Sequence, residues 1–154
     1  MELVDVRPED RELLWNITQK YLYEMTYFYD DKMDAHGNIE YEYFDAYFTE
    51  PERKAFFLYE EKDLVGFAMM RSYPYTEVET HLVLTEFTVF PMYRRKHLAK
   101  KAAEMIFDRF KGVWEVKYNE QNAAGKALWN QLAEKYHPDK TSLNETETLL
   151  TFSS

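Results

Sequence analysis

The chain has 154 residues and carries 28 acidic side chains against 19 lysines and arginines, so its formal net charge is −9. This length favours one domain with a real core, and the acidity argues against general nucleic-acid binding, whose affinity comes mainly from phosphate neutralisation. Because the chain has no cysteine, disulfides, thiolate catalysis and cysteine-ligated metal sites are excluded. No apolar run reaches the ~18 residues of a transmembrane helix, and the start MELVDVRPED lacks the pattern of a signal peptide. We therefore expect a cytoplasmic protein.

The first third of the chain predicts a strand and a long amphipathic helix. Residues 2–6 alternate loosely and indicate a strand, and Pro8 followed by two acids is typical of a helix start. Apolar side chains then recur at helical spacing at Leu14, Ile17, Tyr21, Met25 and Phe28. A polar break over residues 29–38 follows, and residues 41–48 suggest a short aromatic helix.

The middle of the chain predicts a hairpin and one long strand. Residues 54–60 and 64–73 are apolar and β-rich, and the short EKD sequence between them fits a tight turn. A loop is expected around Pro74. Residues 81–90 then indicate a long apolar strand, which Pro91 closes.

The last third alternates between helices and strands. We expect a helix over residues 94–110 with Gly112 at its C-terminal cap, a strand over residues 113–118, a second helix capped by Asn122, and a last strand over residues 146–152. A strand–helix–strand unit requires a right-handed crossover and parallel pairing. The expected fold is therefore a mixed α/β sheet flanked by helices, in one domain that covers residues 1–154.

The densest basic cluster lies where the long strand gives way to a helix, at Arg94, Arg95, Lys96 and Lys100. A helix N-terminus has unpaired backbone N–H groups and a partial positive charge, so cations are unfavourable there unless an anion compensates. A solvated basic face is the alternative explanation, but a strand-to-helix joint favours a phosphate site.

The stretch VFPMYRRKHLAKKAAEMIF resembles the acetyl-coenzyme A signature of the GNAT family of N-acetyltransferases, in which Val-x-Pro ends a central strand and Arg/Gln-x-x-Gly-x-Gly/Ala opens a helix. The later stretch WEVKYNEQNAAGKALW is similar to the family's strand followed by Asn-x-x-Ala-x-x-Phe-Tyr, with Asn122, Gly125, Leu128 and Trp129 at those places. The resemblance covers nearly the whole chain. It implies a GNAT-like fold, whose central mixed sheet is splayed at the cofactor-binding strand.

The resemblance implies acetyl-coenzyme A as co-substrate, with strand backbone groups on the pantetheine arm and loop and helix amides on the pyrophosphate. The implied cofactor-binding residues are Phe87, Val89, Arg94, Arg95, Lys96, His97, Leu98, Ala99, Lys100, Asn122 and Trp129. Two of them depart from the family pattern. His97 replaces a glycine that lets the backbone approach a phosphate closely. Trp129 replaces a tyrosine that protonates the leaving thiolate, so Trp129 is expected to pack against the cofactor.

An amine attacks a thioester only in its neutral form, so a carboxylate or a water chain is needed as a base at pH 7. Glu86, inside the long apolar strand, is the first candidate and Glu115, in the following strand, is the second. A solvent-exposed strand position is the alternative for both, and it is favoured for Glu115. Tyr118 is a candidate acid.

The function implied by the resemblance is N-acetyl transfer, by direct attack, from acetyl-coenzyme A to a primary amine of a small molecule or peptide. The alternative is a non-catalytic acetyl-coenzyme A sensor, which His97 and Trp129 keep open. Acids interleaved with tyrosines over residues 27–43 suit a cationic amine, although a solvated loop explains any one of them. His36 and His81 have no second ligand at metal spacing, so no metal is expected. Neither a nucleic acid nor a membrane is expected as a partner, and a homodimer is left open.

Overall fold

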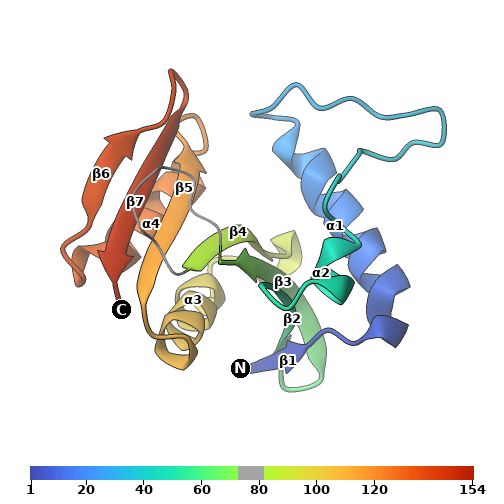
Figure 1. The fold of residues 1–154 in the computed structure, drawn as a ribbon, viewed down its shortest axis with the longest axis horizontal. Coiled ribbons are helices and arrows are strands. Elements are labelled where there is room, and N and C mark those ends of the chain that lie inside the picture. The colour runs from blue at the N-terminus through green and yellow to red at the C-terminus, as the bar shows by residue number, and fades with distance from the viewer. Residues whose placement is uncertain (73–81) are drawn as a thin grey trace.

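The computed structural model describes residues 1–72 and 82–154, so the loop expected around Pro74 and the expected strand start at His81 lie outside the described residues. Seven strands form one sheet in the order β1-β2-β3-β4-β5-β7-β6 (Figure 1). The strands are β1 (Glu2–Asp5), β2 (Arg53–Glu60), β3 (Asp63–Arg71), β4 (Leu82–Val89), β5 (Val113–Asn119), β6 (Asp139–Ser142) and β7 (Glu147–Ser153). Among these strands, β4 and β5 pair in parallel and the other neighbours pair antiparallel, which confirms the mixed sheet.

Helices cover both faces of the sheet (Figure 1). They are the 3-10 helices η1 (Pro8–Asp10) and η2 (Pro91–Tyr93) and the α-helices α1 (Arg11–Met25), α2 (Ala46–Thr49), α3 (Leu98–Arg109) and α4 (Ala123–Glu134). On one face, Leu14 of α1 and Tyr47 of α2 pack with Phe67 of β3. On the other face, α3 and α4 pack around Trp114 and Val116 of β5. Side chains of a strand point alternately to its two faces, so β2 contributes Phe56 to one core and Phe57 to the other.

The sequence does not predict β6. Its four residues, Asp139–Ser142, are all exposed and form the edge of the sheet beyond β7. An edge strand with no buried face has no apolar alternation from which it could be recognised.

The helix expected from residue 94 begins later, at Leu98. The chain first makes η2 and then four non-helical residues, because Arg95 and His97 have left-handed φ values of 63° and 59°. A right-handed helix needs φ near −63° at every residue, so it cannot run through these two positions. The expected helix start at Arg94 is therefore wrong, and a loop separates β4 from α3.

The strands β4 and β5 pair through three residues each, Leu82–Leu84 opposite Trp114–Val116, and then separate. On its other edge β4 carries a β-bulge, because the partners of Leu84 and Glu86 are adjacent in β3 and leave Thr85 as the extra residue. A bulge bends its strand and increases the local twist. The bend lies where β4 and β5 begin to diverge.

Candidate active site

A cavity of about 910 Å³ occupies the space between the diverging ends of β4 and β5. This volume lies within the usual range for cofactor and small-molecule sites. The lining residues fall within five segments of the chain, namely residues 21–31, 85–89, 94–100, 117–119 and 122–131. The site is thus assembled from α1 and the segment after it, β4, the loop before α3, β5 and α4.

One end of the cavity is bordered by backbone N–H groups that have no protein acceptor. The first backbone bond of α3 runs from the Lys101 N–H to the His97 carbonyl at 3.1 Å. Among the residues that the structure describes, none accepts a hydrogen bond from the backbone N–H groups of Arg95 to Lys100. Successive free amides around left-handed residues at a helix N-terminus form a concave anion-binding site.

His97 immediately precedes α3, and its backbone is left-handed with φ 59° and ψ 15°. Glycine adopts this conformation without steric cost, whereas histidine is one of the residues that tolerate it. The glycine of the family pattern is therefore explained by backbone conformation as well as by close approach to a phosphate. The histidine side chain is exposed and lines the cavity.

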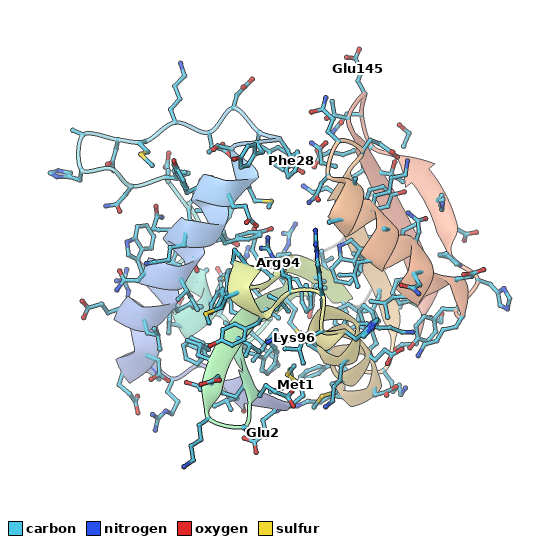
Figure 2. The ribbon with its side chains drawn as sticks, turned by 180° about the vertical axis from the view of Figure 1, so that it is seen from behind. Met1, Glu2, Phe28, Arg94, Lys96 and Glu145 are labelled. Carbon is cyan, nitrogen blue, oxygen red and sulfur yellow. The ribbon has the colours of Figure 1, made fainter. Side chains whose placement is uncertain are left out.

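The guanidinium of Arg94 is held by the protein itself. Its two terminal nitrogens donate to the Glu24 carboxylate at 3.0 and 2.7 Å, and its Nε donates to the Val89 carbonyl at 2.7 Å. Figure 2 shows Arg94 at the centre of the molecule, between α1 and the half that contains α4. Arg95 and Lys100 line the cavity, while Lys96 is not among the lining residues. Arg94 thus ties the loop to α1, and a phosphate would have to compete with Glu24 for it.

Glu86 lies directly after the bulge, is partly buried and lines the cavity. The Tyr41 hydroxyl donates to its Oε1 at 3.2 Å, and the Tyr21 hydroxyl is a second hydrogen-bond partner. Burial raises the pKa of Glu86 to about 7, against the opposing effect of the two hydroxyls and the Lys117 charge. A carboxyl group with this pKa can act as a base at neutral pH.

The structure separates the other two catalytic candidates. Glu115 is 0% exposed, so the exposed position favoured from the sequence is wrong. It lies opposite Val83, where β4 and β5 are still paired, and it is not among the lining residues of the cavity. Tyr118 lies past the divergence and lines the cavity together with Glu86.

Two aromatic rings form one wall of the cavity, because Trp129 of α4 meets Phe87 of β4 edge to face at 5.1 Å between ring centroids. Asn122 caps α4 as predicted, accepting a hydrogen bond from the Gly125 N–H at 3.0 Å. Among the sequence-predicted cofactor residues, Phe87, Val89, Arg94, Arg95, His97, Leu98, Ala99, Lys100, Asn122 and Trp129 line the same cavity.

The segment after α1 reaches across to the far half of the sheet, which sequence reasoning did not predict. The Tyr29 hydroxyl donates to the Glu147 carboxylate at 2.8 Å, and Lys117 forms an ion pair with the same carboxylate at 3.1 Å. The Asn119 amide reaches the Phe28 carbonyl at 3.5 Å, and Figure 2 shows Phe28 facing that half of the molecule. These partners are 91 and 118 residues apart, so no local sequence signal could have paired them.

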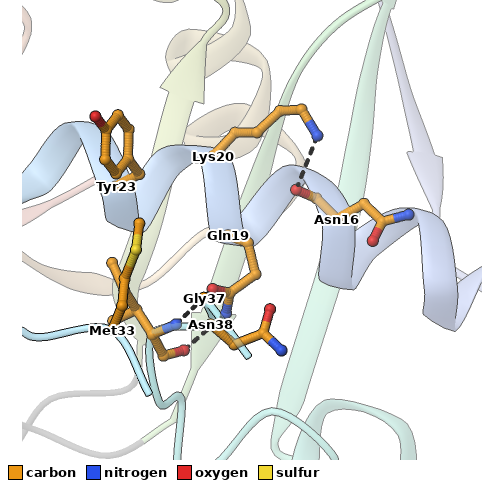
Figure 3. A pocket seen from close by; sticks show the side chains of 8 residues that line it. Asn16, Gln19, Lys20, Tyr23, Met33, Gly37 and Asn38 are labelled. Carbon is orange, nitrogen blue, oxygen red and sulfur yellow. Dashed lines mark hydrogen bonds between the residues drawn. The ribbon is translucent and has the colours of Figure 1, made fainter. Parts of the chain in front are cut away.

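A smaller hollow of about 270 Å³ lies between α1 and residues 33–39 (Figure 3). Gln19 fixes this loop, because its side-chain amide both donates to the Ile39 carbonyl and accepts from the Ile39 N–H, each at 2.7 Å. The lining contains amides, Lys20 and Tyr23 but no carboxylate or histidine. The arrangement organises a loop and offers no acid–base pair.

Two properties of the described residues bear on metals and membranes. No group of three or more histidine, aspartate or glutamate residues there could hold a metal ion. Within residues 1–72 and 82–154, no helix is long and apolar enough to span a membrane.

Comparison with known proteins agrees with this geometry. A sequence model of the acetyltransferase (GNAT) family matches residues 14–133. No curated protein matches the chain.

Similar solved structures include an acetyltransferase from Thermus thermophilus, with 17% identity and a TM-score of 0.69 over 99% of this chain and 96% of that one. Arabidopsis thaliana NAA60 in complex with acetyl-CoA has 10% identity and a TM-score of 0.62 over 99% and 97%. A variant of spermidine N-acetyltransferase SpeG from Vibrio cholerae has 10% identity and a TM-score of 0.65 over 99% and 95%. The family match over most of the chain, together with the shared fold, shows that this protein belongs to the acetyltransferase (GNAT) family.

Proposed function

We propose that residues 1–154 form one N-acetyltransferase domain, which transfers an acetyl group from acetyl-coenzyme A directly to a primary amine of a small molecule or peptide. Family membership supports acetyl transfer, and the Arabidopsis neighbour was solved with acetyl-CoA. The observation that carries the amine step is Glu86, a carboxyl group in the cavity whose pKa is raised to about 7 by burial. Such a group is suited to accept a proton from an alkylammonium or an attacking amine near neutral pH.

The cavity has the features that acetyl-coenzyme A requires. The free amides from Arg95 to Lys100 suit the pyrophosphate, and the Arg95 and Lys100 side chains add positive charge there. Beyond Leu84, the edge of β4 that includes Phe87 and Val89 is not paired with β5, so its backbone suits the amide-rich pantetheine arm. When bound, the cofactor supplies the acetyl group as a thioester.

In the proposed reaction, Glu86 takes one proton from the alkylammonium, directly or through a water molecule. The neutral nitrogen then forms a bond to the acetyl carbon, and the carbon–sulfur bond breaks as the nitrogen loses its second proton. The departing thiolate takes a proton from the Tyr118 hydroxyl, with water as the alternative donor, and the proton released by the nitrogen restores that donor. The proton on Glu86 passes to solvent. The indole of Trp129 is too weak an acid for this step, and its contact with Phe87 supports a packing role.

The cavity end around Glu86 suits a cationic acceptor. Glu86 and Asp31 provide negative charge, and Tyr21, Tyr27 and Tyr29 provide aromatic faces. Carboxylates combined with aromatic rings favour ammonium groups. The neighbour named as a spermidine N-acetyltransferase supports a small amine acceptor for this protein.

The test is turnover with a panel of amines, measured as coenzyme A thiol release and confirmed by mass spectrometry of the acetylated product. Glu86→Gln is expected to lower the rate at pH 7 by ~10²–10⁴-fold and to leave acetyl-coenzyme A affinity unchanged. Glu42→Gln is the matched control, because this exposed carboxylate is not among the cavity-lining residues. An unchanged rate and pH profile in Glu86→Gln would remove Glu86 as the base. Cofactor binding without turnover of any amine would favour the sensor alternative.

A further inference from the structure

The bulge at Thr85 places two consecutive β4 side chains on the same face of the sheet. Leu84 and Phe87, on either side of the pair, both pack against the core beneath α3 and α4. Thr85 and Glu86 both form hydrogen bonds with tyrosines of the segment between α1 and β2, on the opposite face. Regular alternation would have turned one of these two residues away, and a bulge re-aims side chains in this way.

Two tyrosines of one short segment hold this pair. Tyr41 donates to the Glu86 carboxylate at 3.2 Å, and the Tyr47 hydroxyl lies 2.6 Å from the Thr85 Oγ1. The Thr85 hydroxyl donates its proton to the Met69 carbonyl at 2.9 Å, so Tyr47 must be the donor to Thr85. Tyr47 therefore anchors the bulged residue, while Tyr41 anchors the carboxylate that follows it.

The rings of Tyr41 and Tyr47, which bear these two hydroxyls, belong to one packed aromatic cluster. The rings of Tyr41 and Tyr47 are 6.3 Å apart, and Tyr41 also meets Phe44 edge to face at 6.4 Å. Phe44 and Tyr47 are 2% and 8% exposed, so neither ring can move without disturbing the core. Neither Tyr41 nor Tyr47 is among the residues that line the cavity.

We propose that Tyr41 and Tyr47 are positioning residues for the transfer reaction: Tyr47 fixes the bulge that aims Glu86 into the cavity, and Tyr41 orients its carboxylate. This inference rests on the proposed role of Glu86 as base. The two tyrosines contact the base and the strand that carries it, and neither contacts the reacting atoms.

The electrostatic consequence differs between the two tyrosines. The groups that face Glu86 are the hydroxyls of Tyr21, Tyr29 and Tyr41, the carboxylate of Asp31 and the ammonium of Lys117. Burial and the adjacent Glu86 charge raise the pKa of Tyr41, which keeps this hydroxyl protonated and able to donate. Its hydrogen bond stabilises the ionised carboxylate, so removing it raises the pKa of Glu86. Tyr47 hydrogen-bonds to Thr85 and to Tyr41 but not to Glu86, so its removal changes geometry and leaves the bond from Tyr41 to Glu86 in place.

The experiment compares the parent with Tyr41→Phe, Tyr47→Phe and the control Tyr43→Phe. Tyr43 belongs to the same segment, but its exposed ring packs on Arg53 at 4.8 Å and it makes no contact with Glu86. The pH midpoint at which the Glu86 carboxyl group ionises is measured by ¹³C NMR titration. Its resonance is assigned by comparison with Glu86→Gln. The pH dependence of kcat and the KM for acetyl-coenzyme A are measured on the same proteins.

Tyr41→Phe is expected to raise the Glu86 midpoint by about 0.5–1 pH unit and to shift the acid limb of the rate profile by the same amount. Its kcat should therefore fall ~2–5-fold at pH 7 and recover at pH 9. Tyr47→Phe should lower kcat at every pH without recovery and leave the KM for acetyl-coenzyme A unchanged. Tyr43→Phe should match the parent in both measurements.

An unchanged Glu86 midpoint in folded Tyr41→Phe would overturn the assignment of Tyr41, and an unchanged kcat in folded Tyr47→Phe would overturn that of Tyr47. The NMR titration needs no turnover. A shifted midpoint in a protein that acetylates no amine would therefore refute the proposed function and leave the contact between Tyr41 and Glu86 established.

Discussion

Replacing His97 by glycine is expected to stabilise the free protein. The backbone of His97 is left-handed with φ 59°, which costs a residue with a Cβ roughly 1–2 kcal/mol. Glycine avoids this cost, although its greater freedom in the unfolded chain offsets about 0.5–1 kcal/mol. The histidine side chain is exposed and makes no capping hydrogen bond, so little contact energy is lost. The net gain is up to about 1.5 kcal/mol, or up to roughly 6 °C in melting temperature for a domain of this size.

The sign of this change depends on where α3 begins. If His97 lay in the first turn of a helix from Arg94, as the sequence predicts, glycine would instead cost up to about 1 kcal/mol. Differential scanning calorimetry of the apo proteins measures the difference. A lower melting temperature for His97→Gly would show that the left-handed conformation and the later helix start are incorrect.

The same substitution should also change cofactor binding. Removing the side chain lets a phosphate approach the loop amides more closely, so His97→Gly should bind coenzyme A at pH 8 at least as tightly as the parent. Calorimetric titration at this pH tests the prediction, with Arg95→Gly as the comparison. Its φ of 63° gives the same backbone gain, but it loses a cationic side chain. Far weaker binding by His97→Gly at pH 8 would instead make the neutral imidazole a ligand.

Two further predictions concern the cofactor end of the cavity. At ~100 times its dissociation constant, acetyl-coenzyme A should stabilise the protein by about 2.7 kcal/mol, or roughly 5–10 °C; a flat response at saturating cofactor would contradict the proposed site. Arg94→Ala should lower the melting temperature, because the substitution removes the hydrogen bonds from Arg94 to Glu24 and Val89. Together these bonds contribute about 1–2 kcal/mol to the free energy of unfolding. Arg95→Ala should leave melting unchanged and instead weaken coenzyme A binding and reduce its salt dependence. The reverse pattern would identify Arg94 as the phosphate ligand.

Local chemistry explains why much of the fold could be predicted from the sequence. The Asn122 cap is recognisable because its partner, Gly125, lies three residues away along the chain. The parallel pairing of β4 and β5 follows from the helix between them, since a crossover must return in the same direction. The two motifs also led to Phe87 and Trp129, whose side chains line one cavity.

Features that depend on long-range packing could not be predicted in the same way. The left-handed residues before α3 have no sequence signal in a stretch without glycine, and the apolar spacing of the helix does not mark its first residue. Glu115 was expected to be exposed because it alternates with the apolar Trp114 and Val116 along the strand, yet tertiary structure buries all three. The hydrogen-bond partners of Glu86 are Tyr41, which lies 45 residues away along the chain, and Tyr21, which the helical pattern predicts simply as a core position.

The distribution of charge in the cavity explains how an acidic chain can bind an anionic cofactor. With a net charge of −9, the protein repels anions at long range, but at physiological salt charges farther than about 8 Å are largely screened. Binding therefore depends on the local groups, which are the free amides from Arg95 to Lys100 and the two cationic side chains at that end. Glu24, the acid in the cavity lining that lies beside this end, is neutralised by Arg94. The other acids of the lining, Glu86 and Asp31, lie close enough to interact with each other, and a cationic amine is proposed to bind beside them. Under the proposed function, one cavity would thus separate an anion site from a cation site, and the transfer would take place between them.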